Sequence, residues 1–228
     1  MRFGKAKFAA LAAGAALAIS VTTPATAAET KPMAPPATAQ TEDFVNDDCV
    51  AQINTISGEK NLSAEETDAY IKDLCTAQIT SEVTKAEPVT VEEAKTAAAD
   101  MGMNATDTAA FVADAEIQAV NTHNWEHTYW GGSIVEKHAG RTFFNGTHAW
   151  VASASEPGYH VCHSEGSWAV GFAITQHECT MPGAGASADA MYRFDWSAIV
   201  AGSPATFTVG LHHSTDRLGN ISTWQNGG

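Results

Sequence analysis

The sequence is poor in basic residues: 12 lysines and arginines stand against 26 aspartates and glutamates, which gives a formal net charge of −14. A surface with this excess of negative charge repels phosphate backbones and anionic lipid headgroups. The composition therefore argues against a nucleic acid or a membrane surface as a partner.

Several motifs that carry chemistry are missing from the sequence. It has no C-x-x-C pair, no G-x-S-x-G turn around a serine, and no glycine-rich loop followed by lysine. These absences argue against a four-thiolate metal site, a serine-hydrolase elbow and a phosphate-binding loop, respectively. We expect no cofactor and no set of catalytic residues.

Cysteine is scarce as well, with only four residues, at positions 49, 75, 162 and 179. An even number of cysteines in an exported chain favours disulfides over free thiols. Three pairings are possible. We favour Cys49–Cys75 and Cys162–Cys179, because each bond then lies within one compositional half of the chain.

One long apolar run occurs, at residues 8–21, and basic residues precede it. With the small residues Ala25 and Ala27 after it, this layout predicts a secretory signal peptide over residues 1–27, although a retained membrane anchor is the alternative. No later run is apolar enough to span a bilayer. We therefore expect a secreted, extracellular protein that does not insert into a membrane after signal cleavage.

The next part of the chain divides into a linker and a helical region. Residues 28–42 are rich in Ala, Pro and Thr and predict a disordered linker, because they offer little apolar surface to bury. Residues 43–120 predict helices, with capping boxes at Ser63/Glu66 and Thr90/Glu93. One helix is expected to carry apolar side chains at positions 71, 74, 75 and 79.

Residues 121–228 differ in composition, since all six tryptophans and all nine histidines fall between His123 and Trp224. Turn residues separate short segments in which large apolar and polar side chains alternate, a pattern typical of antiparallel strands. The fold class is therefore α+β, with a small helical region followed by an antiparallel β-sandwich or small β-barrel. Apolar side chains should share one inward face in each of two strands, at positions 192, 194, 196 and 198 and at positions 205, 207, 209 and 211.

We expect residues 168–175 to form the central strand of the sheet, because large apolar side chains occupy every second position. We also expect the imidazoles to lie mainly on the β surface. A divalent metal site built from several of them, or a patch that gains charge as the pH falls, is the alternative. The histidines concerned are His138, His148, His160, His163, His177, His212 and His213.

The segment His123 to His127 reads HNWEH and fits the H-x-x-E-H pattern of inverted zinc proteases. On a helix, His123 and His127 would hold zinc and Glu126 would be the base. On a strand the two histidines would lie about 13 Å apart, too far to share one ion. The segment lies where helix gives way to strand, so we regard this zinc hydrolase as an alternative only.

Four aromatic residues are candidates for a binding surface, namely Trp125, Tyr129, Trp130 and Trp150. Exposed rings of this kind on a sheet stack on sugars or on partner side chains. The partner would then be an extracellular protein or a glycan.

The order of the segments along the chain and the sequence HVCHSEGSWAVGF at residues 160–172 resemble those of small secreted proteins of actinobacteria. This resemblance implies an export signal, a helical stretch and a Trp/His-rich β-domain, and carries no activity with it. The leading hypothesis is a secreted, non-enzymatic binding protein with the β-domain as its binding face. The alternatives are the zinc hydrolase and a secreted toxin or inhibitor.

Overall fold

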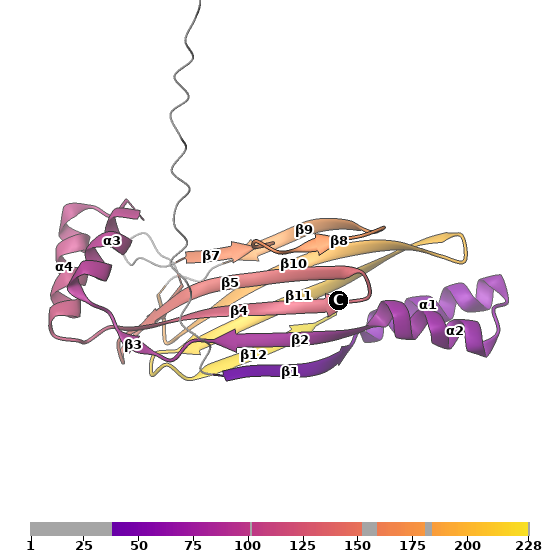
Figure 1. Ribbon diagram of the computed structural model, residues 1–228, viewed down its shortest axis with the longest axis horizontal. Helices are drawn as coiled ribbons and strands as arrows, with labels where there is room; N and C mark the ends of the chain where they lie inside the picture. The colour runs from indigo at the N-terminus through magenta and orange to yellow at the C-terminus, as the bar shows by residue number, and fades with distance from the viewer. Residues whose placement is uncertain (1–37, 101, 152–158, 181–183, 228) are drawn as a thin grey trace, which may run out of the picture. The chain divides into compact units, whose positions relative to one another are not determined.

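The structure is a computed structural model that describes residues 38–100, 102–151, 159–180 and 184–227. The expected signal peptide at 1–27 and the first ten residues of the expected linker lie outside the described residues. The described strands form two antiparallel sheets that face each other, so the fold is an α+β sandwich (Figure 1).

The first sheet has the strand order β1-β2-β4-β5-β6, and three short strands add to it. Strand β3 pairs with β4, whereas β7 and β8 pair with β5. The bounds are β1 (Thr38–Val45), β2 (Thr76–Val83), β3 (Glu87–Pro88), β4 (Asn121–Gly131), β5 (Ile134–Phe144), β6 (Ala149–Trp150), β7 (Tyr159–Cys162) and β8 (Trp168–Ala169).

The second sheet has the order β12-β11-β10-β9. Its bounds are β9 (Ala173–Thr180), β10 (Ser187–Val200), β11 (Ser203–Asp216) and β12 (Ile221–Asn226). The two long central strands stay in register from Ser187 opposite Asp216 to Val200 opposite Ser203. Their inward apolar side chains form the core between the sheets, which confirms the alternation predicted from the sequence: Tyr192, Phe194, Trp196, Phe207, Val209 and Leu211 are all at most 3% exposed.

Helices lie at both ends of the strands (Figure 1). One group is α1 (Asp47–Lys60), α2 (Ala64–Tyr70) and the π-helical turn η1 (Ile71–Cys75), and the other is α3 (Val91–Asp100) with α4 (Ala105–Glu116). The reciprocal hydrogen bonds of both predicted capping boxes form, at Ser63/Glu66 and at Thr90/Glu93. They satisfy backbone groups that the first helical turn leaves free.

The helical region does not stand apart from the sheets. Strand β2 begins directly after Cys75 and pairs with both β1 and β4. Position 79 lies on this strand and not on the expected helix, because from Thr76 onward every second residue is buried, as in a half-buried strand. Strand β1 also begins inside the expected linker, so residue 120 does not mark a boundary between structural units.

The expected central strand at 168–175 is instead divided into two short pieces at sheet edges. Trp168 belongs to β8 and Ile174 to β9, and Gly171 between them has a left-handed φ of 79°. Trp168 and Val170 are 46% and 66% exposed, so their side chains do not form the core. The central positions of the second sheet belong instead to β10 and β11, which pair with each other over 14 residues.

Both predicted disulfides are present in the structure. Cys49–Cys75 joins α1 to the end of η1, with both residues 1% exposed. Cys162–Cys179 joins β7 of the first sheet to β9 of the second, with the Cα atoms 5.9 Å apart. The second bond therefore ties the two layers of the sandwich together at one edge.

Candidate histidine site between the sheets

The H-x-x-E-H segment lies in strand β4, not in a helix. His123 and His127 point into the space between the sheets, where they are 1% and 0% exposed. Glu126 lies on the other face of the strand, where its carboxylate accepts a 2.7 Å hydrogen bond from Lys137 Nζ. The three groups therefore do not converge on one ion as they would on a helix.

The register of the first sheet brings a different set of histidines together. His127 on β4 is directly opposite His138 on β5, and His138 is opposite Cys162 on β7. In the neighbouring inward row, Gly140 lies between Trp125 and His160. Because residues opposite each other in a sheet share a face, these side chains all lie in one inward-facing patch.

Trp125 is the aromatic centre of this patch. Its ring stacks on His213 of the second sheet at 4.1 Å between centroids and meets His138 edge-on at 4.8 Å. The indole nitrogen donates a 2.9 Å hydrogen bond to Thr142 Oγ1. Gly140 leaves the space for this indole, since a Cβ at that position would collide with the six-membered ring of Trp125.

The two histidines in closest contact are His138 and His160, whose Nε2 atoms lie 2.5 Å apart. This separation is shorter than the roughly 2.7–3.2 Å of ordinary N–H···O hydrogen bonds, so the two Nε2 atoms are in direct contact. The Sγ atom of Cys162 belongs to the same group, since it and one nitrogen from each histidine all lie within 4.8 Å of one another. His138 and His160 are thus the pair best placed to hold a metal ion.

Several neighbouring ring nitrogens are buried without partners. Among the described residues, no hydrogen bond reaches Nδ1 of His123, either ring nitrogen of His127, or Nδ1 of His138. The backbone of His212 lies close enough to His127 to raise the pKa of that imidazole slightly, but it forms no hydrogen bond with either ring nitrogen. A buried polar atom without a partner costs free energy, and such atoms in a native protein often mark a functional site.

Burial keeps these imidazoles neutral. Loss of hydration lowers the pKa of His123, His127 and His160 to about 4. The same cause, with the neighbouring histidines adding to it, holds the pKa of His138 and His213 well below the ordinary value. At neutral pH each ring therefore has a free lone pair, which is the form that binds metal ions.

A buried carboxylate lies beside the histidines, on the same face of β5 and two residues before His138. Glu136 is fully buried, and its oxygens accept hydrogen bonds from Tyr192 Oη at 2.8 Å and from His163 Nδ1 at 2.9 Å. An interior carboxylate makes the surroundings of the site more favourable to a cation.

The expectation that the imidazoles lie mainly on the β surface is wrong for most of them. His123, His127, His138, His212 and His213 are all at most 8% exposed. His160 is half-buried, whereas His148, His163 and His177 are exposed. The reason is the register of the strands: β4, β5 and β11 place histidines on the inward faces of the two sheets, so these rings are buried between the sheets.

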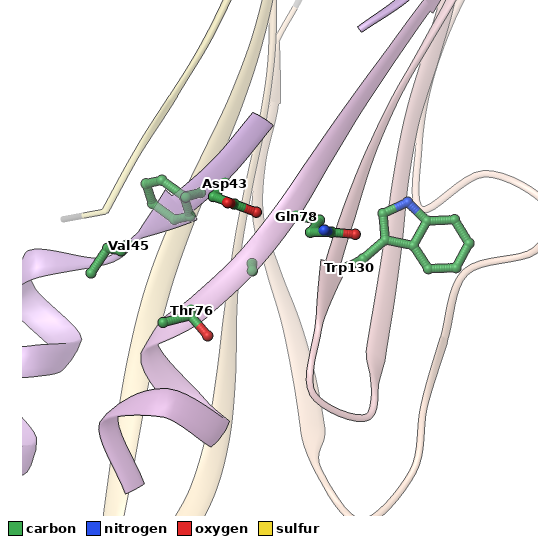
Figure 2. Close-up of a pocket in the computed structure, with 7 residues that line it drawn as sticks. Asp43, Val45, Thr76, Gln78 and Trp130 are labelled. Atoms are coloured by element: carbon green, nitrogen blue, oxygen red, sulfur yellow. The ribbon is translucent and has the colours of Figure 1, made fainter. Parts of the chain in front are cut away.

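The four aromatic residues proposed for a binding surface do not share one face. Trp125, Tyr129 and Trp150 are at most 2% exposed and belong to the core. Trp130 is 46% exposed on the outer face of the first sheet. It borders a groove of about 500 Å³ to which Asp43, Phe44, Val45, Thr76, Ala77 and Gln78 also contribute (Figure 2).

His138 and His160 are two of seven histidines that the sequence offers as possible metal ligands, and nothing local to either of them distinguishes it. Cys162 was expected only in a disulfide. The signal that selects the three is the pairing of β5 with β7, which was not predicted.

No family model matches this chain, and neither do any of the curated proteins or solved structures compared with it. Among the described residues, no helix is long and apolar enough to cross a membrane. Two disulfides are compatible with an extracellular protein.

Proposed function

We propose that this is a secreted, non-enzymatic binding protein whose ligand is a transition-metal ion of the zinc and copper class. His138 and His160 are the proposed ligands. The observation that supports this most strongly is that one ring nitrogen of each lies within 4.8 Å of the other and of Cys162 Sγ, beside ring nitrogens that are buried without hydrogen bonds. Imidazole nitrogens suit zinc, copper and nickel, whereas calcium and magnesium prefer oxygen ligands.

The surroundings support an ion at this point. Zinc with two imidazole bonds of about 2.1 Å at a tetrahedral angle holds the nitrogens about 3.4 Å apart, so the two rings separate by about 1 Å when an ion enters. His160 is half-buried on the short edge strand β7, so a small movement of its ring would provide this separation. Water molecules would complete the coordination of the ion.

Binding is preferred to catalysis because of where the carboxylates lie. Glu126, the base in the zinc hydrolase hypothesis, is on the opposite face of β4 and pairs with Lys137. Glu136 is on the correct face, but Tyr192 and His163 already occupy its oxygens. Neither carboxylate is free to activate a metal-bound water.

The test is calorimetric titration of the exported, disulfide-bonded chain with Zn²⁺ and Cu²⁺. We expect one ion per chain, with affinity reduced at least about tenfold in His138→Ala and in His160→Ala. His148→Ala is the matched control, because His148 is an exposed histidine of the same domain. Absence of binding by the wild type, or equal binding by all three variants, would contradict the proposal.

A second candidate function is binding of a glycan or extracellular protein on the outer face of the first sheet. Trp130 and Trp168 are each 46% exposed and flank Val135 in one cross-strand row. Gln78 and Asp43 continue this row across β2 and β1, next to the groove in Figure 2. Exposed indoles beside amide and carboxylate groups suit both sugar rings and protein surfaces.

Glycan-array screening and pull-down from culture fluid test this second function. Trp130→Ala is expected to abolish capture of the ligand. Trp224→Ala should not affect capture, because it replaces a half-exposed indole on the second sheet. Capture that is unchanged in Trp130→Ala would reject the outer face as the contact surface.

A further inference from the structure

We propose that the Cys162–Cys179 disulfide is the redox-controlled half of the metal site. Reduction converts it into two thiolates that join His138 and His160 in a two-cysteine, two-histidine set for Zn²⁺. This inference rests on the proposed metal-binding function and adds a second, tighter binding state to it.

Both sulfur atoms of this disulfide lie close to the ring nitrogens of His160. Its Nε2 atom lies 3.7 Å from Cys162 Sγ, and its Nδ1 atom lies 3.8 Å from Cys179 Sγ. Tetrahedral zinc with bonds of about 2.1 Å to nitrogen and about 2.3 Å to sulfur places these two atoms about 3.6 Å apart. Cys162 Sγ therefore already lies at the distance from His160 Nε2 that zinc requires.

Cys179 is the proposed fourth ligand, and it is already bonded to the third, Cys162. Cys179 Sγ is bonded to Cys162 Sγ in the oxidised protein and lies toward the other nitrogen of His160. After reduction the side chain of Cys179 is free to rotate, because this residue is exposed on the edge strand β9. A turn about its Cα–Cβ bond brings the sulfur toward the ion held by the other three groups.

The two disulfides differ in accessibility. Cys49 and Cys75 are each 1% exposed, whereas Cys162 is half-buried and Cys179 is exposed. Thiol–disulfide exchange requires in-line attack on a sulfur atom, so access decides which bond is reduced first. A reductant therefore opens the Cys162–Cys179 bond beside the histidines and leaves the Cys49–Cys75 bond intact.

The reaction needs a dithiol reductant, which is the co-reactant of the proposal. One of its thiolates attacks Cys179 Sγ and releases Cys162 as a thiolate, and its second thiol then closes on the first sulfur and releases Cys179. Two electrons and two protons pass to the protein, and the reductant leaves as a cyclic disulfide. Binding of Zn²⁺ displaces the two thiol protons.

The exchange alters how the sheets are held together. In the oxidised protein a covalent bond joins β7 to β9, and in the reduced, zinc-loaded protein the ion joins the same two strands. Zinc therefore keeps this edge of the sandwich closed after the covalent bond is lost.

Cobalt(II) is the probe that tests this inference, because thiolate ligands give it a charge-transfer band that imidazoles do not. The full exported chain is reduced with a dithiol, desalted without oxygen and titrated with Co²⁺ and Zn²⁺ beside the oxidised chain. Peptide mapping of alkylated thiols confirms that only the bond between Cys162 and Cys179 has opened.

We expect the thiolate band only in the reduced wild type, together with zinc affinity on the order of 100-fold higher than in the oxidised form. The double variant Cys162→Ser/Cys179→Ser should keep the weaker affinity of the oxidised protein and show no band under either condition. His160→Ala, which retains both cysteines, should lose most of the gain on reduction.

Equal affinity in both redox states, or a reduced protein without the thiolate band, would overturn the inference while leaving the histidine site of the oxidised protein intact. Loss of binding in His138→Ala and His160→Ala before reduction supports that histidine site by itself. Binding only after reduction would support the four-ligand set and reject the oxidised-state site.

Discussion

The indole of Trp125 on β4 and the imidazole of His213 on β11 stack face to face, 4.1 Å apart and 9° from parallel. This contact joins the two sheets at the position where the buried histidines gather. Trp125 also meets His138 edge-on, so one ring links the second sheet to the proposed ligand.

Replacement of Trp125 by alanine should destabilise the protein strongly. The side chain is 1% exposed, and loss of a buried tryptophan costs about 3–5 kcal/mol in free energy of unfolding. Urea denaturation measures the change. Trp130→Ala is the control, because that indole is 46% exposed and its removal should cost less than about 1 kcal/mol. Equal costs would mean that Trp125 does not support the inter-sheet contact.

Gly140→Ala should affect both stability and metal binding. A Cβ at Gly140 collides with the ring of Trp125, and overpacking of this kind costs about 1–3 kcal/mol. The displaced indole would also shift His138 and weaken metal binding. Gly58→Ala in α1 is the matched control, since no atom lies within 4 Å of its added Cβ. That variant should be more stable by about 0.5–1 kcal/mol, because alanine is the better helix former. Destabilisation of the control by a similar amount would contradict this account.

Much of the fold could be predicted because the signals were local. The alternation in β10 and β11 and the capping boxes at Ser63 and Thr90 each depend on a few neighbouring residues. Strand β2 was missed because apolar side chains at positions 71, 74 and 75 continue with helical spacing into position 79. The pairing partners β1 and β4, which decide its structure, are far away in the sequence.

The site was harder to predict than the fold. Nine histidines in one compositional region suggested a metal site, but pairing between strands decides which of them meet. His127 meets His138 through a hairpin, whereas His160 reaches His138 only because β7 pairs with β5. Histidine is intermediate between the buried and the exposed residue types, so composition alone does not show that five of the nine are buried.

The metal-free protein should lose stability as the pH falls. Burial lowers the pKa of His123 to about 4, below the value of about 6.5 expected in the unfolded chain. The unfolded chain therefore binds more protons between these pH values, and the free energy of unfolding falls as the pH drops from about 6.5 to about 4. His123 alone accounts for about 2 kcal/mol between pH 7.5 and pH 5.

Urea denaturation of chelator-treated protein at these two pH values measures this loss. His123→Asn cannot titrate and should show a smaller difference between pH 7.5 and pH 5 than the wild type. The exposed His148 serves as the control, and His148→Ala should leave the difference unchanged. Greater stability at pH 5 than at pH 7.5 would show that the buried rings are not held neutral.

The two disulfides should have separable roles. Cys49→Ala/Cys75→Ala opens a bond with a sequence separation of 26 residues and should cost about 3 kcal/mol in stability. Because this bond joins α1 to η1, away from His138 and His160, metal affinity should stay within about twofold of wild type. Calorimetric titration below the lowered melting temperature checks this. A large loss of affinity would mean that the helical end of the sandwich shapes the site.

X-ray absorption at the zinc edge of the oxidised, zinc-loaded chain shows whether His138 and His160 hold the ion. After removal of excess metal, we expect one retained ion with imidazole ligands at about 2.0–2.1 Å and no sulfur ligand, and loss of that signal in His138→Ala. A protein that retains no zinc, or an ion held only by oxygen ligands, would contradict this expectation.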